Sequence, residues 1–146
     1  MKTLLLTMPV FFLSLVIHWE NNIEKAKEVA KSEHKYILLN FSGSDWCGPC
    51  IRLHKEVFES DAFAAFAATH LVMVNADFPR QKKNQLPKVQ QQQNDKLADK
   101  YDPTGSFPYT LLLDENGTVI KKWDGYPDGG TTQFINEIKS AIHVTD

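Results

Sequence analysis

Two cysteines, Cys47 and Cys50, are the residues of this chain best suited to do chemistry, and only Gly48 and Pro49 separate them. An apolar run over residues 36–41 precedes the pair, and a helix-like run follows it. At such a strand-to-helix junction, the free N–H groups of the first helical turn stabilise the first sulfur as a thiolate, which is the form that attacks disulfides. The spacing therefore predicts a thiol–disulfide redox site, with Cys47 as the more exposed, attacking thiol and Cys50 as the shielded, resolving thiol.

A zinc site is the alternative chemistry for a Cys-x-x-Cys pair. A closed zinc site needs four ligands, and no second pair of ligands with suitable spacing accompanies the cysteines. His54 lies one helical turn after Cys50, but we expect it on a helix surface or partly packed. We therefore expect no metal, and no cofactor other than the redox-active Cys47–Cys50 disulfide itself.

Composition limits the class of protein. A chain of 146 residues with 42% hydrophobic residues fits one globular domain with a real core. Its formal net charge of −2 gives no reason to expect a nucleic-acid partner. Because both cysteines belong to the candidate site, no structural disulfide remains to hold the fold.

The apolar periodicity predicts the order of the elements around the cysteines. We expect helices over 23–32, 51–58 and 62–69, strands over 36–41 and 71–76, a hairpin over 109–123 and a final amphipathic helix. Asn116-Gly117 would turn the hairpin with residues of positive φ, and Thr131 or Thr132 would cap the last helix. Its inward side chains would be Phe134, Ile135, Ile138 and Ile142. This order predicts a three-layer α/β/α domain with a central mixed sheet.

The amino terminus resembles an export signal. Met1 and Lys2 precede an apolar run over 3–17, which at about 1.5 Å per residue is too short to cross a hydrocarbon core of about 30 Å comfortably. No A-x-A-like cleavage site follows. A removed signal peptide, an uncleaved N-terminal anchor and a buried first helix all stay open. We expect residues 1–18 to be the leader, residues 19–146 to be the domain, and the protein to be periplasmic or secreted.

The stretch 78–96 is polar and basic, since Arg80, Lys82, Lys83, Lys88 and Lys96 outnumber Asp95. A basic surface for an acidic partner is one interpretation. A solvated loop that enters a helix is the preferred one, because runs of charge are usually soluble faces. The helix would begin near Leu86-Pro87, with Val89, Leu97 and Tyr101 near one stripe.

Two segments together resemble a known family. Residues 46–50 read WCGPC, which matches the active-site motif of thioredoxins residue for residue. Residues 106–111 read SFPYTL and resemble the segment that carries the cis-proline of that family. The similarity covers about residues 23–142, and it marks the stretch 78–96 as an insertion.

This resemblance implies a thioredoxin fold with a cis Phe107–Pro108 bond facing Cys47. It also implies the residues that would contact a substrate, which are Trp46, Gly48, Pro49, Phe107 and Pro108. Three positions depart from the family pattern. Asn40 stands where thioredoxins have a buried acid, Met73 stands where they have a lysine beside that acid, and Lys55 replaces the proline that kinks the active-site helix. We therefore expect the Cys50 proton to leave by solvent or by another acid, with Asp45 and Glu56 nearest in sequence.

The function implied by the resemblance is a thiol–disulfide oxidoreductase that reduces protein disulfides in the cell envelope. We expect it to act as a monomer on disulfide-containing protein substrates and to be recharged by a membrane thiol–disulfide electron donor. A disulfide oxidase or isomerase is the alternative within the same class. A thioredoxin-fold module that binds peptides without redox turnover is the alternative from another class.

Overall fold

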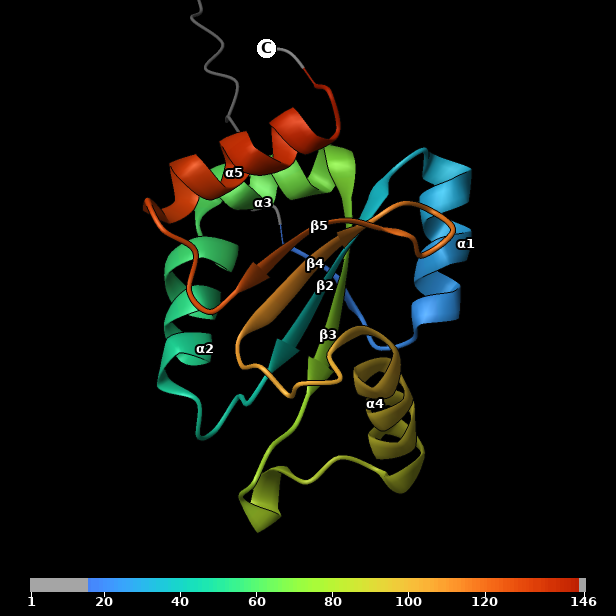
Figure 1. The fold of residues 1–146 in the computed structure, drawn as a ribbon, viewed down its shortest axis with the longest axis vertical. Coiled ribbons are helices and arrows are strands. Elements are labelled where there is room, and N and C mark those ends of the chain that lie inside the picture. The colour runs from blue at the N-terminus through green and yellow to red at the C-terminus, as the bar shows by residue number, and fades with distance from the viewer. Residues whose placement is uncertain (1–15, 145–146) are drawn as a thin grey trace, which may run out of the picture.

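A five-stranded mixed sheet forms the middle layer of the structure, which is a computed structural model describing residues 16–144 (Figure 1). The strand order is β1-β3-β2-β4-β5. The strands are β1 (Trp19–Glu20), β2 (Tyr36–Ser42), β3 (Leu71–Asp77), β4 (Tyr109–Leu113) and β5 (Val119–Asp124). β1, β3 and β2 run parallel, whereas β4 is antiparallel to β2 and β5 is antiparallel to β4. The predicted mixed sheet and hairpin are confirmed.

Helices cover both faces of the sheet, as predicted. α2 (Gly48–Leu53), a π-helical turn (His54–Phe58), α3 (Asp61–His70) and α5 (Gly130–Ala141) cover one face, and α1 (Ile23–Glu33) and α4 (Lys88–Tyr101) cover the other (Figure 1). A short 3-10 helix (Lys82–Asn84) lies between β3 and α4. The predicted helix over 51–58 therefore begins at Gly48, and its second half, which contains Lys55, is π-helical.

The alternation of side chains along the strands divides the core in two. Leu38, Met73 and Leu112 point toward α3 and α5, where Phe63 and Phe134 are buried. The intervening strand residues point toward α1 and α4, and these are Ile37, Leu39, Phe41, Val72, Val74, Ala76, Leu111 and Leu113. β2 is buried on both faces, as its nearly continuous apolar run predicts.

Three local predictions are wrong. Val89 is 68% exposed, because the buried side of α4 carries Asn94, Leu97 and Tyr101 instead. α5 begins after Gly129, at a φ of 76°, and no side chain caps it. Thr131 instead donates its hydroxyl to the Glu56 carbonyl oxygen at 3.0 Å. In the hairpin only Gly117 has a positive φ, since the Asp114 carboxylate accepts from the turn N–H groups.

The predicted leader, residues 1–18, lies mostly outside the described residues. Of its last residues, Ile17 packs against the cluster beneath α3 and α5, and the ring of His18 lies 3.1 Å from a Glu20 carboxylate oxygen. Within residues 16–144, no helix is both long enough and apolar enough to span a bilayer.

Candidate active site

Cys47 and Cys50 form a disulfide at the amino end of α2, with an S–S distance of 2.03 Å. Cys47 is the residue that caps the helix, and its Sγ accepts the backbone N–H of Cys50 at 3.3 Å. Pro49 lies in the first turn, where the helix needs no N–H from it. The first sulfur is thus held at the positive end of the helix, as predicted.

The expected difference in exposure between the two cysteines is not seen in this disulfide form. Cys47 is 5% exposed and Cys50 is 4% exposed. The disulfide and the Cys50 N–H hold the Cys47 sulfur against the first turn of α2, which covers it. Gly48 and Pro49 are the exposed residues of the motif.

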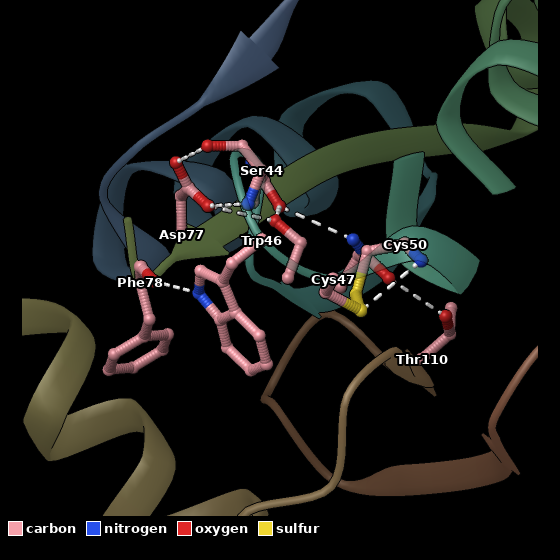
Figure 2. The surroundings of a disulfide bond; sticks show 10 residues. Ser44, Trp46, Cys47, Cys50, Asp77, Phe78 and Thr110 are labelled. Carbon is pink, nitrogen blue, oxygen red and sulfur yellow. Dashed lines mark hydrogen bonds between the residues drawn. A yellow bond between two sulfur atoms is a disulfide. The ribbon is translucent and has the colours of Figure 1, made fainter. Parts of the chain in front are cut away.

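The Phe107–Pro108 peptide bond is cis, as the resemblance implies. β4 starts directly after it, and Tyr109 is paired with Phe41 in the register of β2. Pro108 therefore lies level with the carboxyl end of β2, from which the chain continues to the cysteines. Thr110, also on β4, is among the residues that surround the disulfide (Figure 2).

Trp46 contacts both the proline loop and the insertion. Its ring meets the ring of Phe107 edge-on, with centroids 5.3 Å apart, and its indole N–H donates to the Phe78 carbonyl oxygen at 2.7 Å (Figure 2). The guanidinium of Arg80 lies 3.6 Å above the same ring. Trp46 is therefore fixed on several sides rather than simply packed in the core.

Gly43 is a site residue that the sequence interpretation missed. A Cβ atom at this position would lie 2.3 Å from the Trp46 ring. The Gly43 carbonyl oxygen accepts the N–H of Cys47 at 2.9 Å. Only glycine allows this approach, so a glycine between the strand and the cysteine motif was the available signal.

The residues just before Trp46 also bind the segment that follows β3. The Asp77 carboxylate accepts the Ser44 backbone N–H at 2.9 Å and the Ser44 hydroxyl at 2.6 Å (Figure 2). The Asp45 carboxylate accepts the backbone N–H groups of Arg80 and Gln81 and the side-chain amide of Asn84, each at 2.9 Å. Ser44 thus binds the end of β3, and Asp45 and Trp46 attach the insertion to the active-site loop.

A row of uncharged polar side chains lies at the position of the family acid. Asn40 is 5% exposed and accepts the Thr110 hydroxyl at 3.0 Å. Its side-chain NH2 donates to the side-chain oxygen of Asn75 (Oδ1) at 3.3 Å, and the Ser42 hydroxyl donates to the same oxygen at 3.0 Å. The neighbour of Asn40 in the strand register is Asn75, whereas the residue we compared with the family lysine, Met73, lies opposite Leu38.

The two acids nearest to Cys50 in sequence, Asp45 and Glu56, are bound by other donors. The hydrogen bond from the Arg80 backbone N–H, with those from Gln81 and Asn84, lowers the pKa of Asp45. Arg52 and then the Tyr126 hydroxyl lower the pKa of Glu56, which lies 3.3 Å from Arg52 and 2.7 Å from Tyr126. A carboxylate with a lowered pKa is a weaker base, and both are occupied by other donors.

A buried acid that the sequence interpretation missed, Asp102, precedes the loop that carries Phe107 and Pro108. Asp102 is 3% exposed, and its Oδ1 accepts the Ser106 backbone N–H at 3.0 Å. Its Oδ2 accepts no hydrogen bond from the described residues. Burial raises the pKa of this carboxyl above its ordinary value, although the hydrogen bond from the Ser106 backbone N–H partly offsets the rise. Asp102 therefore fixes the start of the loop that carries Phe107 and Pro108.

No group of three or more potential metal ligands occurs among residues 16–144. The site that the described residues do form consists of a disulfide, an aromatic wall and a polar row. Such an arrangement can exchange disulfides.

Comparisons with known proteins agree with this chemistry. Residues 23–140 match the profile of a family described as a thioredoxin-like domain. The protein named disulfide bond reductase DsbH, from Chlamydia pneumoniae, is 39% identical over 126 residues, which are 86% of this chain and 73% of that protein.

Solved structures show the same likeness. A structure titled DsbH oxidoreductase superposes with a TM-score of 0.81 at 33% identity and covers 99% of this chain and 95% of its own. A thioredoxin from Thermus thermophilus superposes with a TM-score of 0.65 at 13% identity, over 86% of this chain and 87% of its own, and shows the shared fold alone.

Proposed function

The chain belongs to the thioredoxin-like family and is a thiol–disulfide oxidoreductase, and from this premise we propose that Cys47 and Cys50 reduce disulfide bonds of protein substrates in the cell envelope. The observation that carries the assignment is the Cys47 sulfur at the start of α2, bonded to Cys50 and accepting the Cys50 N–H.

The cycle begins from the reduced protein. The Cys47 thiolate attacks one sulfur of the substrate disulfide, that disulfide breaks, and the other substrate sulfur leaves as a thiolate and takes a proton from solvent. The Cys50 thiolate then attacks the Cys47 sulfur and displaces the second substrate thiolate. Two electrons have passed to the substrate, and the protein is left with the Cys47–Cys50 disulfide that the structure contains.

The position of each cysteine on α2 supports its role. When the disulfide opens, the unpaired N–H groups of the first helical turn favour negative charge at the Cys47 sulfur, which precedes the helix. Cys50 lies inside that turn. Its sulfur is held next to that of Cys47, so it reacts with the mixed disulfide that forms there. The polar row of Asn40, Asn75, Ser42 and Thr110 offers amides and hydroxyls, so we assign the Cys50 proton to solvent.

The surface around the disulfide supports binding of an extended substrate. Gly48 and Pro49 are exposed, and Trp46 and Phe107 form an aromatic wall beside them. The backbone before the cis Pro108 offers hydrogen-bonding groups to a substrate strand. We assign these five residues to substrate contact.

The relatives and the leader support the proposed direction of the reaction and the proposed location. The relative that is 39% identical is named a reductase, and CGPC resembles the reducing members of the family. Residues 1–18 would direct export as a signal peptide or hold the domain 19–146 at the membrane as an anchor. In an oxidising envelope the pair would need recharging by a membrane thiol–disulfide donor, and the domain would act as a monomer.

Trapping of the mixed disulfide tests the roles of the two cysteines. Cys50→Ser should accumulate a covalent complex with a disulfide-bonded substrate, because nothing displaces the substrate from Cys47. Cys47→Ser should accumulate none, since Cys50 lies within the first turn of α2 rather than ahead of the helix. Non-reducing gels and mass spectrometry of the trapped peptide measure both. Equal trapping by the two variants would overturn the assignment.

A further inference from the structure

We propose that the insertion 78–96, together with Trp46 and Phe107, forms a docking pocket for the part of a substrate polypeptide that flanks the attacked cysteine. The pocket receives an apolar side chain of the substrate. The exposed basic residues of the insertion, called the basic rim here (Arg80, Lys82, Lys83 and Lys88), meet acidic substrate residues next to that side chain. This inference rests on the proposed function and specifies the class of substrate segment. The insertion lies beyond the carboxyl ends of β2 and β3, at the end of the molecule where α2 begins (Figure 1).

The pocket has a volume of about 340 Å³ and lies between the insertion and the active-site loop. Its apolar walls are Trp46, Phe78, Leu86 and Phe107. The rings of Phe78 and Phe107 meet edge-on with centroids 5.6 Å apart. This volume is at the small end of ligand pockets, so it suits one or two side chains rather than a large cofactor.

The pocket is held directly beside the reactive sulfurs. Trp46 precedes Cys47 in the chain, and Phe107 precedes the cis Pro108. The hydrogen bond from the Trp46 indole N–H to the Phe78 carbonyl oxygen fixes the wall that the insertion contributes. A substrate strand bound at the cis-proline would therefore place a neighbouring side chain at the mouth of this pocket.

The charge of the rim selects the kind of polypeptide. Arg80 lines the pocket, and Lys82, Lys83 and Lys88 are exposed residues of the same insertion. None of the four forms an ion pair with a carboxylate in the described part of the chain. The carboxylates of Asp45, which contacts the insertion, and of Asp77, at the end of β3, are already bound by N–H and hydroxyl donors.

In contrast to the basic rim, the residues that line the pocket include negatively charged ones. Asp95 and Asp77 are among its lining residues, so a carboxylate placed deep inside would meet negative charge. Acidic substrate residues are therefore favoured at the rim, and an apolar side chain is favoured inside. Complementary charge of this kind raises the rate of association and the discrimination between partners.

The test compares peptides that share one internal disulfide and differ only in the residues beside it. The flanks are Phe-Asp-Glu, its neutral counterpart Phe-Asn-Gln, and Ser-Asp-Glu. The reduced full-length protein should reduce the first peptide about tenfold faster than either of the others at low salt, measured as the second-order rate constant. Added salt should reduce the difference between the rate constants for Phe-Asp-Glu and Phe-Asn-Gln, because salt screens the charges.

Paired variants locate the effect. Lys82→Glu with Lys83→Glu should abolish the preference for Phe-Asp-Glu over Phe-Asn-Gln. Lys31→Glu with Lys122→Glu, the same charge change on exposed residues of α1 and β5, should keep it.

A second pair of variants tests the apolar pocket. Leu86→Ser should reduce the preference for Phe-Asp-Glu over Ser-Asp-Glu. Val89→Ser, at an exposed residue that does not line the pocket, should keep that preference.

The outcomes separate this inference from the proposed function. If wild-type protein reduces the neutral small molecule hydroxyethyl disulfide but treats the three peptides alike, the docking pocket is refuted and the insertion is only a solvated loop. The same conclusion follows if each paired variant behaves as its control. If no disulfide is reduced, the proposed function fails and the docking inference fails with it.

Discussion

At the scale of single residues, the most informative change is the amide of Asn40 at the position of the family acid. Asn40 accepts from Thr110 and donates to Asn75, so both sides of its amide are used. A carboxylate cannot donate, and it would place negative charge opposite the acceptor oxygen of Asn75. The side chains of the polar row thus satisfy one another's hydrogen bonds without a charge. The partner of Asn40 on β3 is an amide, Asn75, rather than a lysine.

Asn40→Asp should therefore destabilise the fold by about 1–3 kcal/mol at neutral pH, because a buried carboxylate loses its hydrogen bond to Asn75. Burial raises the pKa of an acid, so the loss should be largest above that raised pKa and should shrink as the pH falls and the carboxyl is protonated. Urea unfolding of variant and wild type at about pH 7 and pH 4.5 measures this difference.

The control is Asn116→Asp, the same change at an exposed turn residue, which should alter stability by less than about 0.5 kcal/mol. An Asn40→Asp protein that is equally destabilised at both pH values would show that shape rather than charge is responsible.

At the scale of elements, the insertion is attached to the active-site loop mainly through Asp45. Its carboxylate receives two backbone N–H groups from the insertion, of Arg80 and Gln81. These residues are 35 and 36 positions away in sequence. This contact converts a polar stretch into part of the site.

Asp45→Ala should reduce the hydrogen-exchange protection of the Arg80 and Gln81 amides about fivefold or more, because those N–H groups lose their acceptor. Asp99→Ala, at an exposed position of α4, is the matched control and should leave the protection unchanged.

The pH dependence of this protection has a defined sign. The Arg80 N–H and its neighbours lower the pKa of Asp45 below its ordinary 3.8. The stabilising contact is therefore fully present above that value and is lost only as the pH falls through the lowered pKa. A protection difference between wild type and Asp45→Ala that disappears between about pH 5 and 7 would contradict this account.

The elements themselves were largely predictable from the sequence. β2, α3 and the β4–β5 hairpin follow from apolar periodicity and local caps, which involve residues close in the chain. One of the errors concerns a non-local contact. Thr131 does not cap α5, because its hydroxyl binds the distant Glu56 carbonyl oxygen.

The same limit applies to the site. The cysteine pair and the cis Phe107–Pro108 bond were anticipated from motifs. The attachment of Asp45 and Trp46 to the insertion was not, because hydrogen bonds between loops leave no periodic signal. The close approach of Gly43 to Trp46 was missed for a similar reason, since a glycine in a loop has many possible causes.

At the scale of the whole molecule, the redox pair is separate from what holds the fold together. The two apolar clusters on the faces of the sheet are built from strand and helix side chains and include neither cysteine. Cys47 and Cys50 are three positions apart in sequence, so their disulfide closes a very short loop and restricts the unfolded chain little. The site can therefore cycle between disulfide and dithiol on an unchanged scaffold.

The reduction potential of the Cys47–Cys50 couple tests the central claim most directly. It is measured by equilibrating the full-length protein with glutathione or dithiothreitol buffers and counting thiols by alkylation and mass spectrometry. A protein that reduces substrate disulfides should have a potential near the about −270 mV of thioredoxin. A potential near the about −120 mV of a strong disulfide oxidant would contradict the assignment as a reductase.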